Sequence, residues 1–313
     1  MKVLILGAGA VGGYFGGRLV QAGADVTFLV RPQRAQKLAQ AGLVIKSPLG
    51  DARIPVRTVL QDAVRPEYDL VILSCKAYDL EASIAAIGGA MGPDTLVLPL
   101  LNGMAQLARL EQAYSSARVL GGTCYIASTL DAEGAICHLG KFQGITCGTR
   151  PGNLAHARAL LQELAQAYAR VPLECKVSDE IEQDMWEKFV LLASLAAMTC
   201  LMRASVGEIL AAADGEVLIR EMLATCVAAA SAAGHTPRPD SLQRTQGMLF
   251  ARGSAFTASM LRDMEGGGRV EADHVVGDML QRARAAGIDA RLLAAAYCHL
   301  QAYEARRLRG AAA

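Results

Sequence analysis

The sequence has few aromatic residues, almost no net charge and no cluster of cysteines. Aromatic side chains make up 5% of the 313 residues, charged side chains make up 19%, and the net charge is +1. A chain without an excess of charge lacks the domain-wide basic face of nucleic-acid-binding proteins. The hydrophobic class reaches 52%, which excludes disorder over most of the chain. The length suggests about two globular domains.

Membrane-spanning, secreted and metal-binding classes also lack their usual signals. The apolar run 189–202 is 14 residues long, and a spanning helix needs about 20. The N-terminal apolar run superficially resembles a secretion signal, but glycines with another meaning interrupt it. The eight cysteines include no C-x-x-C pair, which is typical of reduced cytosolic thiols. We expect a cytoplasmic protein without membrane or nucleic-acid partners and without a metal.

The N-terminal half alternates between strand and helix signals. Residues 2–6 and 25–30 read as buried strands around a helix from about 12 to 22, which is a βαβ unit. The alternation predicts a parallel sheet covered on both faces. The remaining expected strands are near 43–46, 53–57, 69–75, 95–100, 118–128, 135–139, 142–147 and 171–176, with helices near 80–90 and 153–168.

The C-terminal half carries helix signals only. Ser178 is a good N-cap before Glu180 and Glu182, and no convincing strand follows it. We therefore expect a cofactor-binding domain over 1–177 and a helical substrate and catalytic domain over 178–313. The expected helices are 179–202, 206–212, 215–233, 240–250, 255–264, 270–286 and 290–308.

A glycine-rich turn follows the first strand. Gly7, Gly9 and Gly12 form a G-x-G-x-x-G motif that opens a helix inside the βαβ unit. This context is typical of dinucleotide sites, in which the pyrophosphate lies against the helix N-terminus. The alternative is a glycine-rich turn without a ligand. The expected pyrophosphate-binding residues are Gly7, Ala8, Gly9, Ala10, Val11 and Gly12.

The end of the second strand favours NADP(H) over NAD(H). NAD sites usually place an acidic residue there for the ribose 2′-hydroxyl. This chain has Arg31 and Arg34 instead, and Asp25 lies at the wrong end of the strand. Guanidinium groups suit a 2′-phosphate. The alternative is that both arginines belong to a solvated loop.

Other polar candidates are ambiguous when taken on spacing alone. Lys76 and Asn102 each follow a predicted strand, at the sheet edge where ligands bind, but either could be an ordinary loop residue. Lys188 borders an apolar helix, where a lysine is usually a surface residue. Ser259 and Glu271 fit an ordinary charged helix face.

Taken together, these motifs resemble the ketopantoate reductase (2-dehydropantoate 2-reductase) family along the whole chain. The resemblance is carried by the GAGAVGGYFGGRL opening, an arginine after the second strand, Cys75-Lys76-Ala77, Leu101-Asn102-Gly103-Met104, Trp186-Glu187-Lys188-Phe189, Gly207-Glu208, Ser259-Met260-Leu261-x-Asp263 and Glu271-Ala272-Asp273.

The resemblance implies a fold and a reaction. The fold is an α/β Rossmann-type domain followed by an all-α domain like that of 6-phosphogluconate dehydrogenase. The reaction is the NADPH-dependent reduction of 2-dehydropantoate to (R)-pantoate, on the route to pantothenate and coenzyme A. Lys188 matches the family's catalytic lysine, a general acid. Glu271 matches the glutamate that positions this lysine, and Ser259 matches a substrate-binding serine. Asn102 matches a hinge asparagine between cofactor and substrate. Lys76 matches a supporting lysine of the cofactor site.

One departure from the family puts the substrate in doubt. The family pattern has asparagines four and eight positions after the catalytic lysine, on the same helix face. This chain has Leu192 and Ala196 there, while Thr199 returns to that face as a candidate substrate ligand. Losing polar contacts should favour a less polar or differently shaped 2-oxo acid.

The sequence leaves three hypotheses of the function open. The first is ketopantoate reductase. The second is a reductase of another 2-oxo acid or an opine-type dehydrogenase. The third is a non-catalytic NADP(H) sensor, which would not need Lys188, Asn102, Ser259 and Glu271 together. Monomer and homodimer are both compatible with the helical half.

Overall fold

The computed structural model describes residues 1–311, which divide into two compact units. The first unit comprises 1–101 and 106–184, and the second comprises 102–105 and 185 to the C-terminus. The boundary lies seven residues beyond the expected position after 177. It falls inside the long helix α6 (Ile181–Met202), whose first turn belongs to the first unit.

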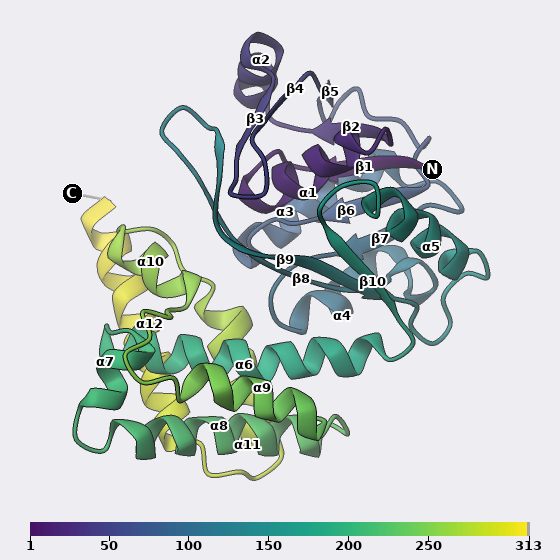
Figure 1. The fold of residues 1–313 in the computed structure, drawn as a ribbon. Coiled ribbons are helices and arrows are strands. Elements are labelled where there is room, and N and C mark those ends of the chain that lie inside the picture. Colours follow the sequence, from purple (N-terminus) through teal and green to yellow (C-terminus); the bar gives the residue numbers. More distant parts are fainter. Residues whose placement is uncertain (312–313) are drawn as a thin grey trace. The chain divides into compact units, whose positions relative to one another are not determined.

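The first unit contains the expected parallel sheet. Its strands run in the order β5-β2-β1-β6-β7, all parallel (Figure 1). The chain passes from β1 to β2 on one side and later to β6 on the other, so the strand order reverses beside β1. In open α/β sheets ligands bind at such a reversal. The strands are β1 (Lys2–Leu6), β2 (Asp25–Leu29), β5 (Arg57–Val59), β6 (Leu70–Leu73) and β7 (Leu96–Pro99).

A second sheet in the same unit was not expected. Parallel pairing joins β10 and β3 to β9, and antiparallel pairing joins β4 to β3 and β8 to β9. The single strand expected near 53–57 is wrong, because Pro55 lacks the N–H that a continuous strand needs. Its two parts join different sheets. The strands are β3 (Leu43–Lys46), β4 (Ala52–Ile54), β8 (Gly121–Leu130), β9 (Ile136–Gly148) and β10 (Glu174–Ser178).

Helix α1 (Ala10–Gln21) packs between these sheets on glycine faces. A Cβ added at Gly16 would lie 2.7 Å from the Phe28 ring on β2. A Cβ at Gly17 would lie 2.8 Å from Leu43 on β3. Gly12 and Gly13 repeat this arrangement one turn earlier. Residues four apart share a helix face, so each sheet meets a stripe without side chains. The other helices of this part are α2 (Pro32–Ala41), α3 (Leu80–Ile87), α4 (Ala105–Tyr114) and α5 (Ala157–Tyr168).

The second unit is helical, as expected. Besides α6 it contains α7 (Val206–Ala211), α8 (Gly215–Ala232), α9 (Pro239–Leu249), α10 (Ser259–Glu265), a π-helical turn η4 (Asp273–Gly277), α11 (Asp278–Ala285) and α12 (Arg291–Ala311). Of the described helices, α6 alone is long and apolar enough to cross a membrane, and 83% of its apolar window is buried in the protein. That burial is typical of a core helix.

Candidate cofactor and catalytic site

The glycine turn after β1 has the geometry of a pyrophosphate cradle. Gly7 adopts a left-handed φ of +82°, and its N–H donates to Leu29 O at 2.8 Å. A Cβ on Gly9 would meet no atom within 4 Å, so open space adjoins the helix start. A Cβ on Gly12 would collide with Ser74 Oγ at the end of β6. Only glycine therefore permits this approach of helix to strand.

The N-terminus of α1 is suited to bind an anion. Gly9 is the N-cap, and among the described residues no side chain caps it. The first turn contains no acidic residue, so no carboxylate competes for the positive end of the helix dipole. The residues present therefore fit a dinucleotide, with Gly7–Gly12 holding its pyrophosphate. Lys76 is half-buried just beyond β6, where it precedes a short 3₁₀ turn.

The two arginines expected at the 2′-phosphate have different surroundings. Arg31 is exposed and forms the N-cap of α2. Arg34 is partly buried and donates hydrogen bonds to Ala8 O and Gly134 O. Arg34 is thus bonded to the protein's own backbone, and these contacts give no support to the prediction that it binds the 2′-phosphate.

Asn102 lies where the chain leaves β7. Gly103 beside it has a left-handed φ of +87°. The segment Asn102–Ala105 groups with the helical unit, although β7 before it and the rest of α4 after it belong to the first unit. The hinge role of Asn102 and what it binds stay predictions.

Lys188 is buried on α6, with 6% of its surface exposed. Its neighbour Glu187 accepts three hydrogen bonds from Arg238, from the backbone N at 2.9 Å, Nε at 2.7 Å and Nη2 at 2.8 Å. Trp186 stacks on His235 at 5.4 Å between ring centroids. The Arg282 guanidinium lies 4.9 Å from the same indole. Trp186 and Glu187, which directly precede Lys188, thus fix this turn of α6 to the 235–238 segment and to α11.

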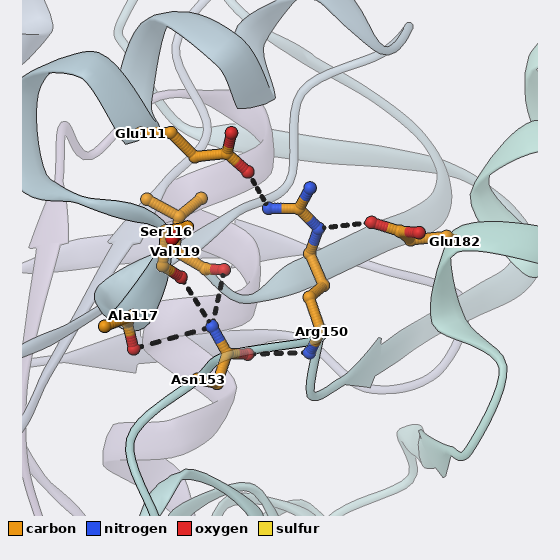
Figure 2. A network of polar contacts seen from close by, with 7 residues as sticks. All are labelled: Glu111, Ser116, Ala117, Val119, Arg150, Asn153 and Glu182. Atoms are coloured by element: carbon orange, nitrogen blue, oxygen red, sulfur yellow. Dashed lines mark hydrogen bonds and ion pairs between the residues drawn. The ribbon is translucent and has the colours of Figure 1, made fainter.

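The start of α6 is anchored separately, within the first unit. Arg150 bonds Glu182 at 2.8 Å and also pairs with Glu111 of α4 (Figure 2). Asn153 Oδ1 accepts the Arg150 N–H at 2.7 Å. The Asn153 amide donates to the carbonyls of Ser116, Ala117 and Val119 (Figure 2). The sequence did not reveal this network, because its members are far apart along the chain.

Glu271 is also buried, with 8% exposed, and it directly precedes Ala272 and η4. π-Helical turns are rare and are frequent at functional sites. Tyr297 of α12 donates a hydrogen bond to Asp273 at 2.7 Å. A Cβ on Gly277 would lie 2.8 Å from the Tyr297 ring. Tyr297 therefore packs along the π turn and fixes the backbone that follows Glu271.

The remaining expected substrate ligands differ in accessibility. Ser259 is exposed as the first residue of α10. Thr199 is fully buried, and its hydroxyl donates to Leu195 O at 2.7 Å and accepts from Ala258 N at 3.4 Å. These bonds support the start of α10 and give no support to a direct substrate contact by Thr199. Ala196 is buried. Leu192, one turn beyond Lys188, is half-buried, whereas every other residue from Met185 to Cys200 is buried.

Sequence reasoning missed the residues that hold the catalytic candidates in place. Arg238 lies between the helices expected at 215–233 and 240–250, Tyr297 lies within the one expected at 290–308, and neither was a predicted site residue. The position of Arg238 between Pro237 and Pro239 is a usable signal, because it marks a fixed N-cap. Among residues 1–311, no group of three His, Cys, Asp or Glu side chains could hold a metal ion.

Comparison with known proteins agrees with the fold and motifs. Residues 3–152 match the family model "Ketopantoate reductase PanE/ApbA", and residues 180–304 match its C-terminal counterpart. The chain is 33% identical to "Uncharacterized oxidoreductase YkpB" of Bacillus subtilis, covering 98% of this chain and 100% of the relative. A crystal structure of a PanE/ApbA family ketopantoate reductase from Ralstonia eutropha superposes with TM-score 0.87 at 25% identity, covering 98% and 100%.

D-mandelate dehydrogenase, solved with NADH and anilino(oxo)acetate, has the same fold, with TM-score 0.86 at 20% identity and coverage of 98% and 99%. The two matched family models together span most of the chain, and the Bacillus subtilis relative is 33% identical over 98% of it. The chain therefore belongs to the ketopantoate reductase family of oxidoreductases.

Proposed function

We propose that this protein reduces 2-dehydropantoate to (R)-pantoate with NADPH. The observation that carries the proposal is the burial of Lys188 on an apolar helix, at a turn that the contacts of Trp186 and Glu187 fix in place. Lysine side chains are mostly exposed in folded proteins. A buried lysine is therefore a candidate functional group, and proton donation to a substrate is a role that suits it.

The residues divide the chemistry between them. The bound cofactor supplies a hydride to the ketone carbon. The Lys188 ammonium donates a hydrogen bond to the ketone oxygen and gives it a proton as negative charge develops there. The Glu271 carboxylate holds and orients that ammonium. Ser259 bonds the substrate carboxylate, and Asn102 orients the substrate against the cofactor. The product is the 2-hydroxy acid, and Lys188 regains its proton from water.

NADP(H) is the proposed form of the cofactor, because Arg31 lies just beyond the second strand and no acidic residue takes its place. Cytoplasmic location stays a prediction from the sequence, and the choice between monomer and homodimer stays open.

The test follows the loss of NADPH absorbance with 2-dehydropantoate for wild type, Lys188→Met and Lys141→Met. Methionine preserves the length of the buried side chain, and Lys141 is an exposed lysine on β9 that serves as the matched control. We expect fast turnover by wild type and by Lys141→Met, and a loss of at least about a hundredfold in Lys188→Met. Tight NADPH binding by wild type without turnover of this substrate would reject it as the substrate.

The second candidate is reduction of a 2-oxo acid with an apolar substituent. It is favoured by Leu192, whose partly exposed apolar side chain lies one helical turn from Lys188. A panel of straight-chain, branched and aromatic 2-oxo acids separates the two candidates. If Leu192→Asn leaves the preference between 2-dehydropantoate and the apolar acids unchanged, Leu192 does not set the substrate.

A further inference from the structure

Arg34 joins three segments that are distant in the sequence. It lies in the first turn of α2, and its guanidinium reaches the glycine turn and the β8–β9 turn. Ala8 O accepts from Arg34 Nε at 3.1 Å and from Nη2 at 2.8 Å. Gly134 O accepts from Arg34 Nη1 at 2.9 Å. The forked geometry of arginine allows one side chain to bond two carbonyls in fixed directions.

The β8–β9 turn is shaped around this guanidinium. Gly134 has a left-handed φ of +86°, and a Cβ there would lie 2.6 Å from Arg34 Nη1. Asp131 Oδ1 accepts the N–H groups of Glu133 at 3.1 Å and Ala135 at 2.8 Å. Lys46 Nζ lies 2.8 Å from Asp131 Oδ2, and their hydrogen bond holds the pKa of Asp131 below its usual range. The bonds to Asp131 therefore stabilise the β8–β9 turn that accepts the hydrogen bond from Arg34.

A second side chain ties the same hairpin to the cofactor turn. Ser128 Oγ of β8 donates to Ala10 O at 3.1 Å. Two carbonyls of the expected pyrophosphate-binding segment, those of Ala8 and Ala10, thus accept bonds from side chains of the protein. Carbonyl oxygens repel phosphate oxygens, so fixing their directions matters for an anion site.

The planar peptide between Ala8 and Gly9 links the direction of the Ala8 carbonyl to that of the Gly9 N–H. In a trans peptide the C=O and the following N–H point in opposite directions. Anchoring Ala8 O on Arg34 therefore turns the Gly9 N–H away from Arg34. Open space adjoins Gly9, where an added Cβ would meet nothing within 4 Å. The bond from Arg34 to Ala8 O thus fixes the direction of the Gly9 N–H at the start of α1, a helix N-terminus suited to an anion.

We propose that Arg34 is a positioning residue for the pyrophosphate turn and serves NADH and NADPH alike, in contrast to Arg31, the 2′-phosphate ligand of the proposed function. The inference rests on the proposed use of a nicotinamide dinucleotide at the glycine turn. The partial burial of Arg34 lowers its pKa from the ordinary value, which agrees with a guanidinium bonded into the protein. Arg31 is exposed and forms the N-cap of α2, three residues before Arg34.

The experiment measures the dissociation constants of NADPH and NADH by fluorescence titration, without substrate. The variants are Arg34→Ala, Arg34→Lys, Arg31→Ala and Lys37→Ala, and a melting temperature is recorded for each. Lys37 is an exposed lysine on α2 and serves as the matched control for loss of one positive charge. Arg34→Lys keeps the charge but cannot bond both carbonyls, so it separates positioning from charge.

We expect Arg34→Ala and Arg34→Lys to weaken both cofactors by about tenfold and by the same factor. Arg31→Ala should weaken NADPH by at least about tenfold and NADH by less than about twofold. A selective loss of NADPH affinity in Arg34→Ala would overturn the proposal, as would unchanged affinity for both cofactors. Equal NADPH binding by Arg31→Ala and wild type would overturn the role of Arg31. The NADH titrations test the role of Arg34 even if the proposed substrate or the NADP preference fails.

Discussion

The two units of this chain differ in what carries their candidate function. In the first unit the backbone carries it: a left-handed glycine, an uncapped helix start and fixed carbonyls create a place for an anion. In the second unit side chains carry it, and the segments that hold the buried residues Lys188 and Glu271 are packed by residues distant in the sequence. The backbone site is built from a local glycine motif that distant residues then hold in place, whereas the side-chain site is assembled by tertiary contacts from the outset. Variants should therefore separate cofactor binding from turnover.

The largest effect on stability should come from Arg238→Ala in the helical unit. It leaves the carboxylate of Glu187 buried without its bidentate partner, and we expect a cost of about 3 kcal/mol. Glu187→Gln should cost about 1 kcal/mol, because the Arg238 side chain is 42% exposed and can be hydrated. Denaturant unfolding measures both, with the exposed Arg244→Ala on α9 as control. Equal costs for the two variants would show that burial of Glu187 is not the dominant factor.

The next effect concerns turnover. Glu271→Gln removes the charge that orients Lys188 while keeping the side-chain shape, so kcat/KM should fall roughly a hundredfold. The NADPH dissociation constant should change by less than about twofold, because Glu271 acts on the substrate side. Glu265→Gln, at an exposed position of α10, is the control. A matching loss of NADPH affinity would refute the division between the units.

A matched pair of glycines tests the backbone of the first unit. Gly16→Ala places a Cβ 2.7 Å from the Phe28 ring, so it should destabilise the protein by about 2 kcal/mol. Gly9→Ala meets no atom within 4 Å, so its stability should change by less than about 0.5 kcal/mol. Cofactor affinity should nevertheless fall in Gly9→Ala, because the methyl group occupies the pyrophosphate side. Thermal unfolding and NADPH titration separate the two; unchanged affinity in Gly9→Ala would mean that the pyrophosphate lies elsewhere.

The smallest effect is a loss of stability at alkaline pH in both units. Burial raises the pKa of Tyr114 in the first unit, and of Tyr297 in the second, to about 12. The unfolded chain loses these protons near pH 10, so stability is complete below that pH and falls as pH rises toward 12. Tyr114→Phe and Tyr297→Phe should each flatten this part of the stability–pH curve. An unchanged slope in both variants would assign the alkaline loss to other groups.

The sequence predicted the local features of this fold better than its long-range ones. The βαβ unit, the glycine turn and the change to helices after Ser178 all rest on short patterns, and α6 begins within two residues of the expected position. The second sheet was missed because β9 pairs with both β3 and β10, and no local pattern encodes which distant strands pair. Pro55 was the available signal for the break between β4 and β5.

The candidate site shows the same limit. Gly7, Gly9 and Gly12 could be read from spacing, whereas Lys188, Ser259 and Glu271 were assigned only through the family resemblance. Arg34 and Thr199 have the right residue types for ligands, but their hydrogen bonds go to the protein itself. A sequence indicates what a side chain can bond and leaves open which partner it meets.

The most direct test of the division between the units combines two measurements on Lys188→Met. NADPH affinity is obtained by fluorescence titration, and turnover is measured over the 2-oxo acid panel. The account predicts that affinity stays within about twofold of wild type while kcat/KM for the best substrate falls at least about a hundredfold. Turnover close to wild type would contradict it, because Lys188 would then not be the proton donor of this enzyme.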